Sequence, residues 1–140
     1  MSKWKLGEKE VYDYYSTQKN AYIYRFSDTH DVNAQLKRFG DKMIYMSPKP
    51  SDFFAIYWGH SFFLEVKTTE NIKGITSSLV KQQAGMRDRI LKCDGEYWYH
   101  IYSIVNKQWY MVPGDVVAKN PNSTWEQLKY YKIDYLKELK

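Results

Sequence analysis

The sequence predicts a mixed α/β domain with a small central sheet, and three observations lead to this fold class. Aromatic and β-branched runs of strand length alternate with stretches of helical period. Two pairs of these runs are separated by short turn-forming sequences, which is typical of β-hairpins. The 140 residues, 44% of them hydrophobic, suffice to bury one core. No repeat or linker divides the chain, so we expect residues 1–140 to form a single domain.

The N-terminal part is predicted to contain a helix, a strand and a second, short helix. Residues 7–18 have the helical period of apolar side chains, and AYIYRFS at 21–27 has the composition of a strand. The next segment, DTHDVNAQLKRFGDK at 28–42, is polar. Asp31 is suited to begin a short helix there and Gly40 to end it.

The centre of the chain predicts a hairpin followed by a helix. The aromatic runs SDFFAIY at 51–57 and SFFLEVK at 61–67 flank the turn sequence WGH. Both faces of each run are apolar, so we expect the hairpin to lie in a sheet that is covered on both sides. The helical period then continues through SSLVKQQAGMRDRILK at 77–92, which predicts one helix.

A second hairpin and a last helix complete the predicted order. YWYHIYSIV at 97–105 and KQWYMV at 107–112 are the two strands of this hairpin. STWEQLKYY at 123–131 predicts a helix, because Ser123 and Glu126 have the spacing of a capping box. The expected order is α-β-(α)-β-β-α-β-β-α, which indicates the mixed α/β class.

The composition favours some classes of function for this protein and excludes others. The net charge of +5 favours an anionic partner, nucleic acid first. Cys93 is the sole cysteine, which excludes an intramolecular disulfide and indicates a reducing compartment. The spacing of His30, His60 and His100 does not match that of zinc enzymes. The chain shows neither a signal-peptide core nor a membrane-spanning run, so we expect a cytoplasmic protein without membrane contact.

The central hairpin predicts a cluster of charged side chains. A turn at residues 58–59 places Asp52 opposite Glu65 when the strands are counted outward. Glu65 and Lys67 are two residues apart, so they share a face of their strand. Asp52, Glu65 and Lys67 are therefore expected on one face, although the surrounding sequence is apolar and burying a charge is costly unless it is paired.

Two opposed carboxylates repel each other, and a divalent cation would resolve the repulsion. Mg²⁺ prefers oxygen ligands and keeps several waters, so Asp52, Glu65 and the backbone carbonyl of Val66 would suffice; Mn²⁺ is the alternative ion. Such an ion activates water for attack on a phosphodiester, and Lys67 would orient that water or stabilise charge on the phosphate. The alternative is a salt bridge between Lys67 and either carboxylate on a solvated rim.

This motif resembles the signature of the PD-(D/E)xK nuclease superfamily. PSD at 50–52 is followed, thirteen residues after Asp52, by EVK at 65–67. The resemblance extends, over about residues 49–117, to RecU-type Holliday junction resolvases of bacteria and phages. In that family the motif lies on a hairpin followed by a helix. The resemblance therefore implies a restriction-endonuclease-like αβββαβ core, in which a central mixed sheet is flanked by helices.

The resemblance also implies roles for single residues. Asp52 and Glu65 would be metal ligands and Lys67 the catalytic lysine. The helix after the hairpin carries a glutamine in the family, which matches Gln82, a further catalytic candidate, or its neighbour Gln83.

The first helix of the family often adds a glutamate to the metal site. Glu8 matches it best and Glu10 is the alternative, while a solvated helix face remains the other interpretation of both. The basic residues that flank the motif would contact DNA phosphates without reading sequence. These are Lys37, Arg38, Lys42, Lys49, Lys73 and Lys81.

The activity implied is that of a Mg²⁺-dependent, structure-specific DNA endonuclease. The first hypothesis is a Holliday junction resolvase that makes paired nicks in four-way DNA junctions. Paired nicks require two active sites, which implies a homodimer, in a bacterial cell or a phage-infected host. The alternatives are another nuclease of the superfamily, of restriction or repair type, and a non-catalytic DNA-binding module of the same fold.

Overall fold

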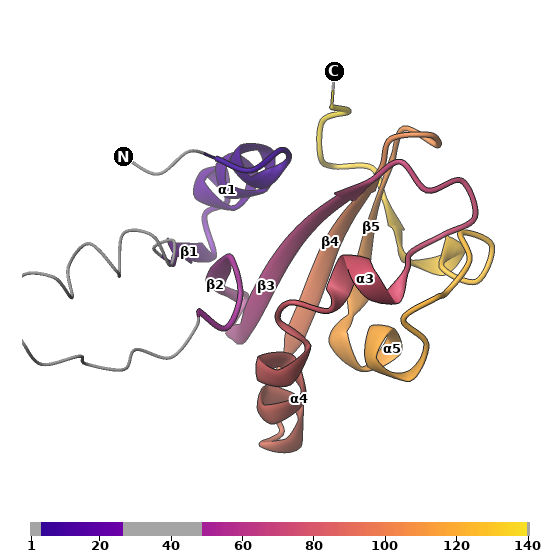
Figure 1. The fold of residues 1–140 in the computed structure, drawn as a ribbon. Coiled ribbons are helices and arrows are strands. Elements are labelled where there is room, and N and C mark those ends of the chain that lie inside the picture. The colour runs from indigo at the N-terminus through magenta and orange to yellow at the C-terminus, as the bar shows by residue number, and fades with distance from the viewer. Residues whose placement is uncertain (1–3, 27–48, 140) are drawn as a thin grey trace, which may run out of the picture.

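The structure, a computed structural model, describes residues 4–26 and 49–139 and has the predicted mixed α/β class. Its strands form one six-stranded sheet, and its helices pack against this sheet (Figure 1). The short helix expected within 28–42 lies outside the described residues. The elements are α1 (Glu8–Thr17), β1 (Ala21–Arg25), β2 (Phe53–Tyr57), β3 (His60–Thr69), α3 (Ser77–Val80), α4 (Ala84–Lys92), β4 (Tyr97–Ser103), β5 (Gln108–Pro113), α5 (Gly114–Lys119), the 3₁₀ helix η2 (Lys129–Tyr131) and β6 (Lys132–Ile133).

The sheet is mixed, and its strands follow the chain in the order β1-β2-β3-β4-β5-β6. β3 and β4 are parallel, and every other neighbouring pair is antiparallel. Both predicted hairpins, β2–β3 and β4–β5, are present. The first turns at Trp58 and Gly59, with Tyr57 opposite His60 as the sequence predicts. The order α1-β1-β2-β3-α4-β4 is that of the predicted restriction-endonuclease-like αβββαβ core.

One face of the sheet is covered by α1 and the C-terminal segment. Val11 and Tyr15 lie four residues apart on α1, so they share a face of the helix, and both are buried. They pack with strand residues such as Phe53 and Leu64 and with Leu136 from the C-terminal segment. The aromatic-rich strands thus supply the core on this side.

The other face is covered by α3, α4 and α5. Val80 and Val117 project from α3 and α5 into a second buried cluster. This cluster includes Tyr97 and Tyr99 of β4, and Trp125 closes it from the C-terminal part. Figure 1 shows these three helices on the side of the sheet away from α1. Because both faces are covered, the central strands are apolar on both sides, as the sequence predicts.

The single helix predicted over 77–92 is wrong, because the structure has two helices there. α3 ends at Val80 and α4 begins at Ala84, with a turn between them. The chain entering α3 is held from a distant segment: Gly74 bridges Thr124, and the Ser77 N–H donates to Asn122 Oδ1. These tertiary contacts fix α3 independently of α4, and the apolar period of the sequence does not record them.

The predicted helix over 123–131 is also wrong. The capping arrangement exists one residue later than expected: the Gln127 N–H donates to Thr124 Oγ1, and the Thr124 N–H donates to Gln127 Oε1. After this turn the chain forms only η2 and then β6, which pairs with β5. Strand pairing at the sheet edge overrides the local helix signal. α5, a short helix after β5, was not predicted.

Among the described residues, no helix has the length and apolar character needed to cross a bilayer.

Candidate active site

The site lies where β2 and β3 part. Their pairing ends at Phe53 and Leu64, whereas β3 continues to Thr69 alongside β4 (Figure 1). Asp52 lies one residue before β2, at the end of the hairpin where β2 and β3 stop pairing. The Val66 N–H of β3 donates to Asp52 Oδ2 with an N···O distance of 2.8 Å. The backbone group that β2 leaves without a partner is thus bound by a carboxylate.

Asp52 and Glu65 are both buried, at 1% and 0% exposure. The observed register agrees with the counted one, because the Phe53–Leu64 pair places the next two positions, Asp52 and Glu65, beside each other. Lys67 shares the face of Glu65, and its Nζ lies 3.0 Å from Glu65 Oε2. Neither oxygen of Glu65 accepts a hydrogen bond of good geometry from the described residues. The predicted trio is therefore brought together in a buried place.

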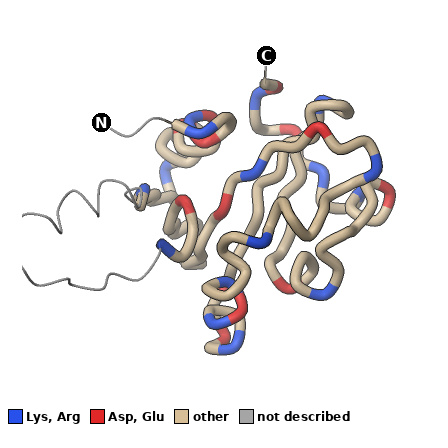
Figure 2. The backbone as a smooth tube through the Cα atoms, viewed as in Figure 1, with Lys and Arg blue, Asp and Glu red and all other residues tan. Residues whose placement is uncertain are grey.

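Two further lysines contact these carboxylates. Lys5, which precedes α1, places its Nζ 3.0 Å from Asp52 Oδ2 and 3.7 Å from Glu65 Oε2. Lys49, expected to contact DNA, has its Nζ 3.2 Å from Asp52 Oδ1. Figure 2 shows basic and acidic positions next to each other along β3 and at the start of β2. The ammonium groups compensate charges that would be costly to bury alone.

Glu8, the first residue of α1, also faces this site. Glu8 is 3% exposed, and its carboxylate lies 3.4 Å from the Arg25 guanidinium of β1. Burial raises the pKa of Glu8, and the nearby charge of Asp52 raises it further. Glu10, the alternative, is half-exposed on the same helix. Of the two candidate glutamates, Glu8 is the one that the structure places beside Asp52.

The two central carboxyl groups differ in their pKa. Burial alone would raise the pKa of Asp52, but Lys5, the Val66 N–H and Lys49 together lower it below its ordinary value. Burial and the Asp52 charge raise the pKa of Glu65 to about 7, although Lys5 and Lys67 oppose the shift. A charged group beside a group that titrates near neutral pH is a common feature of functional sites.

These groups fit a divalent cation that keeps part of its water shell. The carboxylates of Asp52 and Glu65 are the hard oxygen ligands that Mg²⁺ and Mn²⁺ prefer, and the Glu65 oxygens accept no hydrogen bond from the part of the chain that the structure describes. No cluster of three or more His, Cys, Asp or Glu side chains within metal-binding reach occurs in residues 4–26 and 49–139. The Val66 carbonyl as a third ligand stays a prediction.

The glutamine candidates lie in the turn between the two helices. Gln82 was expected on a helix, but it is exposed in this turn and starts neither α3 nor α4. Gln83 is 9% exposed, and its Oε1 has no hydrogen-bond partner among the described residues.

The residues predicted to contact DNA do not form one group among those that the structure describes. Lys73 and Lys81 are exposed, whereas Lys49 lies in the carboxylate site. Lys37, Arg38 and Lys42 lie outside the described residues.

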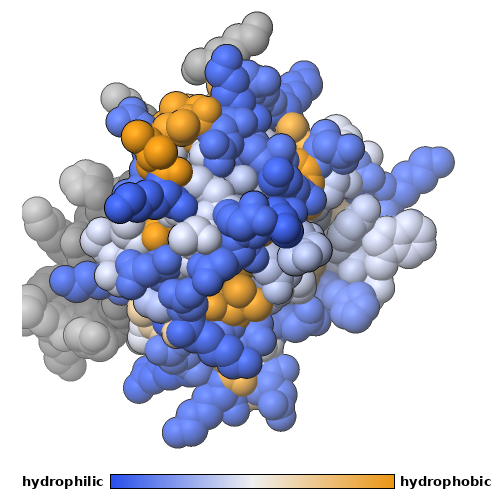
Figure 3. Space-filling view, turned by 90° about the vertical axis from the view of Figure 1, so that its right-hand side faces the viewer, coloured by the Kyte–Doolittle hydropathy of each residue, from blue (hydrophilic) through white to orange (hydrophobic). Residues whose placement is uncertain are grey.

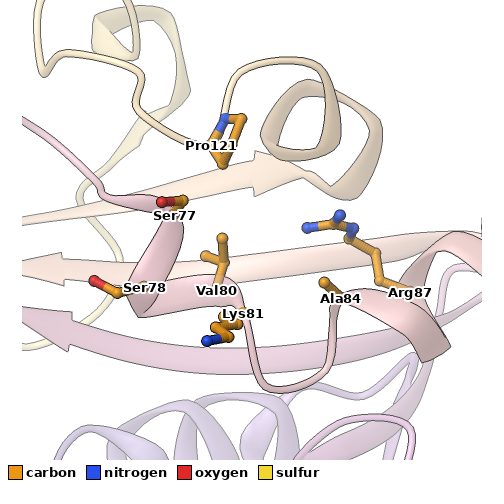
Figure 4. A pocket seen from close by; sticks show the side chains of 7 residues that line it. All are labelled: Ser77, Ser78, Val80, Lys81, Ala84, Arg87 and Pro121. Atoms are coloured by element: carbon orange, nitrogen blue, oxygen red, sulfur yellow. The ribbon is translucent and has the colours of Figure 1, made fainter.

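A hollow of about 370 Å³ opens beside the turn between α3 and α4 (Figure 4). Among the described residues, Lys81 is the one predicted site residue that lines it. The buried Arg87 donates to Asp88 and to the Tyr99 hydroxyl. The carboxylate site thus lies elsewhere, at the parting of β2 and β3. The hollow is lined by Ser77, Ser78, Val80, Lys81, Ala84, Arg87 and Pro121.

Sequence reasoning missed Lys5 and Arg25, which contact the carboxylates from segments that do not belong to the motif. One signal was available for Lys5, because it lies three residues before Glu8. If α1 begins at the carboxylate site, both residues lie close to that site. Arg25 carried no such signal, because its position depends on the pairing of β1 with β2.

Comparison with known proteins finds similarity to solved structures. No family model matches the chain, and no curated protein matches it. Archaeoglobus fulgidus Hjc, a Holliday junction resolvase from an archaeal hyperthermophile, superposes with a TM-score of 0.44 and 16% sequence identity. The alignment covers 90% of this chain and 79% of that chain. The fold described above rests on the strand order and register of the chain itself.

Proposed function

We propose that the chain is a metal-dependent, structure-specific DNA endonuclease, and specifically a Holliday junction resolvase that uses Mg²⁺ or Mn²⁺. The observation that carries the proposal is the buried pair Asp52 and Glu65, with the Lys67 ammonium 3.0 Å from Glu65. The sequence order around this trio is the PD-(D/E)xK pattern described above. Two buried acids can hold a metal ion that activates water, and a lysine beside them can stabilise charge on a phosphate, as metal-assisted phosphodiester hydrolysis needs.

Each residue of the site has a distinct role in this proposal. Asp52 and Glu65 would hold the metal ion, and Glu8 would bind its water shell. When bound, the ion supplies the water activation and charge neutralisation of phosphodiester hydrolysis. Lys67 is kept near the reacting phosphate by its contact with Glu65, so its ammonium can donate to a phosphate oxygen as negative charge develops there.

Glu8 is positioned for its role by Arg25. The guanidinium of Arg25 lies 3.4 Å from Glu8 Oε1 and also stacks over the Trp4 ring, 4.0 Å from its centroid. This stacking keeps the guanidinium next to α1. The first turn of α1 is thereby tied to β1, and Glu8 faces the carboxylate pair.

Charge and the geometry of a junction support the proposed substrate and the proposed assembly. The net charge of +5 and the exposed Lys73 and Lys81 favour contacts with DNA phosphates, which position a duplex without reading its sequence. Resolution of a four-way junction needs two symmetrical nicks, so the active form in this proposal is a two-fold homodimer. A purely binding module is disfavoured, because buried carboxylates repel phosphate.

Cleavage assays test the proposal. The protein is incubated with four-way junctions, linear duplex and single strands, in Mg²⁺ or in EDTA. We expect paired nicks on the junction in Mg²⁺ and no cleavage in EDTA. Asp52→Asn and Lys67→Ala should each lower the cleavage rate by about 100-fold or more, since each removes a group needed in the transition state.

The matched control is Lys9→Ala, which removes an exposed lysine that pairs with Asp13 outside the site. Its cleavage rate should equal that of the wild type. Equal cleavage of all substrates would favour a general nuclease of the same superfamily, and single, uncoupled nicks would contradict the homodimer. Tight DNA binding without cleavage would show that the chain is a non-catalytic DNA-binding module.

A further inference from the structure

Lys5 bridges the carboxylate pair. Its Nζ lies 3.0 Å from Asp52 Oδ2 and 3.7 Å from Glu65 Oε2, so one ammonium group contacts both acids. Both acids are buried, and together they carry a charge that needs a nearby cation. In the protein without metal, Lys5 therefore supplies positive charge at the place where a divalent cation would bind.

The Lys5 ammonium and a divalent cation compete for one place, because Lys5 contacts both acids at once, whereas Lys67 pairs with Glu65. Mg²⁺ approaches its oxygen ligands to about 2.0–2.1 Å and requires a nearly ideal octahedral shell. An ammonium 3.0 Å from Asp52 Oδ2 would lie against that shell and repel the ion. The metal must therefore displace the Lys5 side chain.

The side chain of Lys5 is free to leave without unfolding its surroundings. It is 47% exposed, in contrast to the 12% of Lys67. The neighbouring Trp4 packs against Tyr12 and Phe53, and this packing holds the backbone next to α1. A rotation of the long side chain thus moves the ammonium into solvent while the segment before α1 stays in place.

We propose that Lys5 is an internal counter-cation that stabilises the metal-free site and competes with the divalent ion. This inference rests on the proposed function, because it concerns the same carboxylate pair. It assigns Lys5 a role outside the PD-(D/E)xK trio: Lys5 sets how tightly the metal binds. Loss of its ammonium strengthens metal binding and lowers the stability of the metal-free protein.

Mn²⁺ titration followed by electron paramagnetic resonance of the free ion tests the competition. The proteins are the wild type, Lys5→Met, Lys5→Gln and the control Lys9→Met. If Lys5 occupies the pair for more than nine-tenths of the time, its removal should tighten Mn²⁺ binding by about tenfold or more. Lys9→Met should bind as the wild type does, since Lys9 pairs with Asp13.

Thermal melts of the same four proteins test the stabilising role. In EDTA both Lys5 variants should melt below Lys9→Met, and Mn²⁺ should remove that difference. Lysine acylation of the wild type, read by mass spectrometry, tests the displacement without any substitution. Mn²⁺ should increase the reactivity of Lys5 and leave that of Lys9 unchanged.

The outcomes separate this inference from the proposed function. If none of the four proteins binds Mn²⁺, the metal site itself is wrong. If all bind it with equal affinity and Lys5 reactivity does not respond to Mn²⁺, the competition by Lys5 is wrong while the metal site stands.

Discussion

Asp52 and Glu65 share one buried site but differ in protonation. Asp52 receives the Val66 N–H and contacts two lysines, so its pKa is lowered and it stays charged. Glu65 lies deeper and next to that charge, so its pKa rises to about 7. The first acid thus keeps the site negative, and the second loses its proton close to neutral pH.

The raised pKa of Glu65 predicts how the metal-free protein responds to pH. A carboxyl group whose pKa is higher in the folded state contributes stability that is fully present below its ordinary value of 4.5. That contribution is lost as the pH rises through about 7. In EDTA, the melting temperature of the wild type relative to Glu65→Gln should therefore fall between pH 5 and pH 8, by about 5 °C.

The control for this prediction is Glu10→Gln, on a half-exposed residue of α1. Its melting temperature should follow that of the wild type across the same pH range. A constant difference between the wild type and Glu65→Gln would show that Glu65 does not hold its proton in the folded state.

The trio was predictable from sequence, whereas its surroundings were not. The hairpin has a period of two and a recognisable turn, so counting from residues 58–59 placed Asp52, Glu65 and Lys67 together. Lys5 reaches the trio through the packing of α1, from 47 residues before Asp52. The pattern of the hairpin contains no information about such a contact, and its one signal in the sequence is that Lys5 lies three residues before Glu8.

Among the secondary-structure elements, α1 approaches the sheet closely at Gly7. This residue has a φ of +90°, a backbone conformation that glycine adopts without strain. A Cβ atom there would lie 2.9 Å from Trp109 Cη2 and 3.4 Å from Val66 Cγ1. Gly7 thereby lets the start of α1, with Glu8, approach the strand that carries Glu65.

Substitution of Gly7 should reduce stability and disturb the site together. Gly7→Ala combines a strained φ with contact against Trp109, so we expect it to lower the free energy of unfolding by about 1–3 kcal/mol. Chemical denaturation measures this loss. Cleavage should also slow, because Glu8 moves with the helix start.

Gly85→Ala is the matched control, since a Cβ atom at Gly85 meets nothing within 4 Å. Gly85 lies inside α4, where alanine is favoured over glycine by about 1 kcal/mol, so this variant should be at least as stable as the wild type. Equal stability of the Gly7→Ala protein and the wild type would mean that α1 does not need this close approach.

The predicted elements failed where distant contacts decide the conformation. α1, β1 and the two hairpins follow local periodicity and turn chemistry, and all were predicted. The break at residues 81–83 and the loss of the helix over 123–131 depend on contacts between these two regions, such as that of Ser77 with Asn122. β6 exists because it pairs with β5, and a segment of two residues has no periodicity to detect.

For the molecule as a whole, charge is the property that bears most directly on the proposed binding of DNA. The net charge is +5, and the face shown in Figure 3 is largely hydrophilic, with small, separate hydrophobic patches. Lys73 and Lys81 are exposed in the segment between β3 and α4. Their contribution to the proposed DNA binding should depend on salt, because phosphate contacts release counterions.

Salt titrations of junction binding measure this contribution. Lys73→Ala and Lys81→Ala should each reduce the slope of log K against log[salt] by about one unit, with similar loss for every DNA sequence. The cleavage rate at saturating DNA should not change. Lys129→Ala, an exposed lysine paired with Glu126, is the control and should keep the wild-type slope. An unchanged slope in both test variants would show that Lys73 and Lys81 do not contact DNA phosphates.

The parallel pairing of β3 with β4 has a consequence for how the chain folds. β2 and β3 meet through a two-residue turn, and β4 and β5 through a short loop, so each hairpin can close quickly. β3 and β4 are separated by the whole segment that contains α3 and α4, and closing so long a loop costs more entropy. We therefore expect the two hairpins to form early and to dock late. Until they dock, the strand of Glu65 and Lys67 has its β2 neighbour alone, and its other edge is open to pairing with other chains.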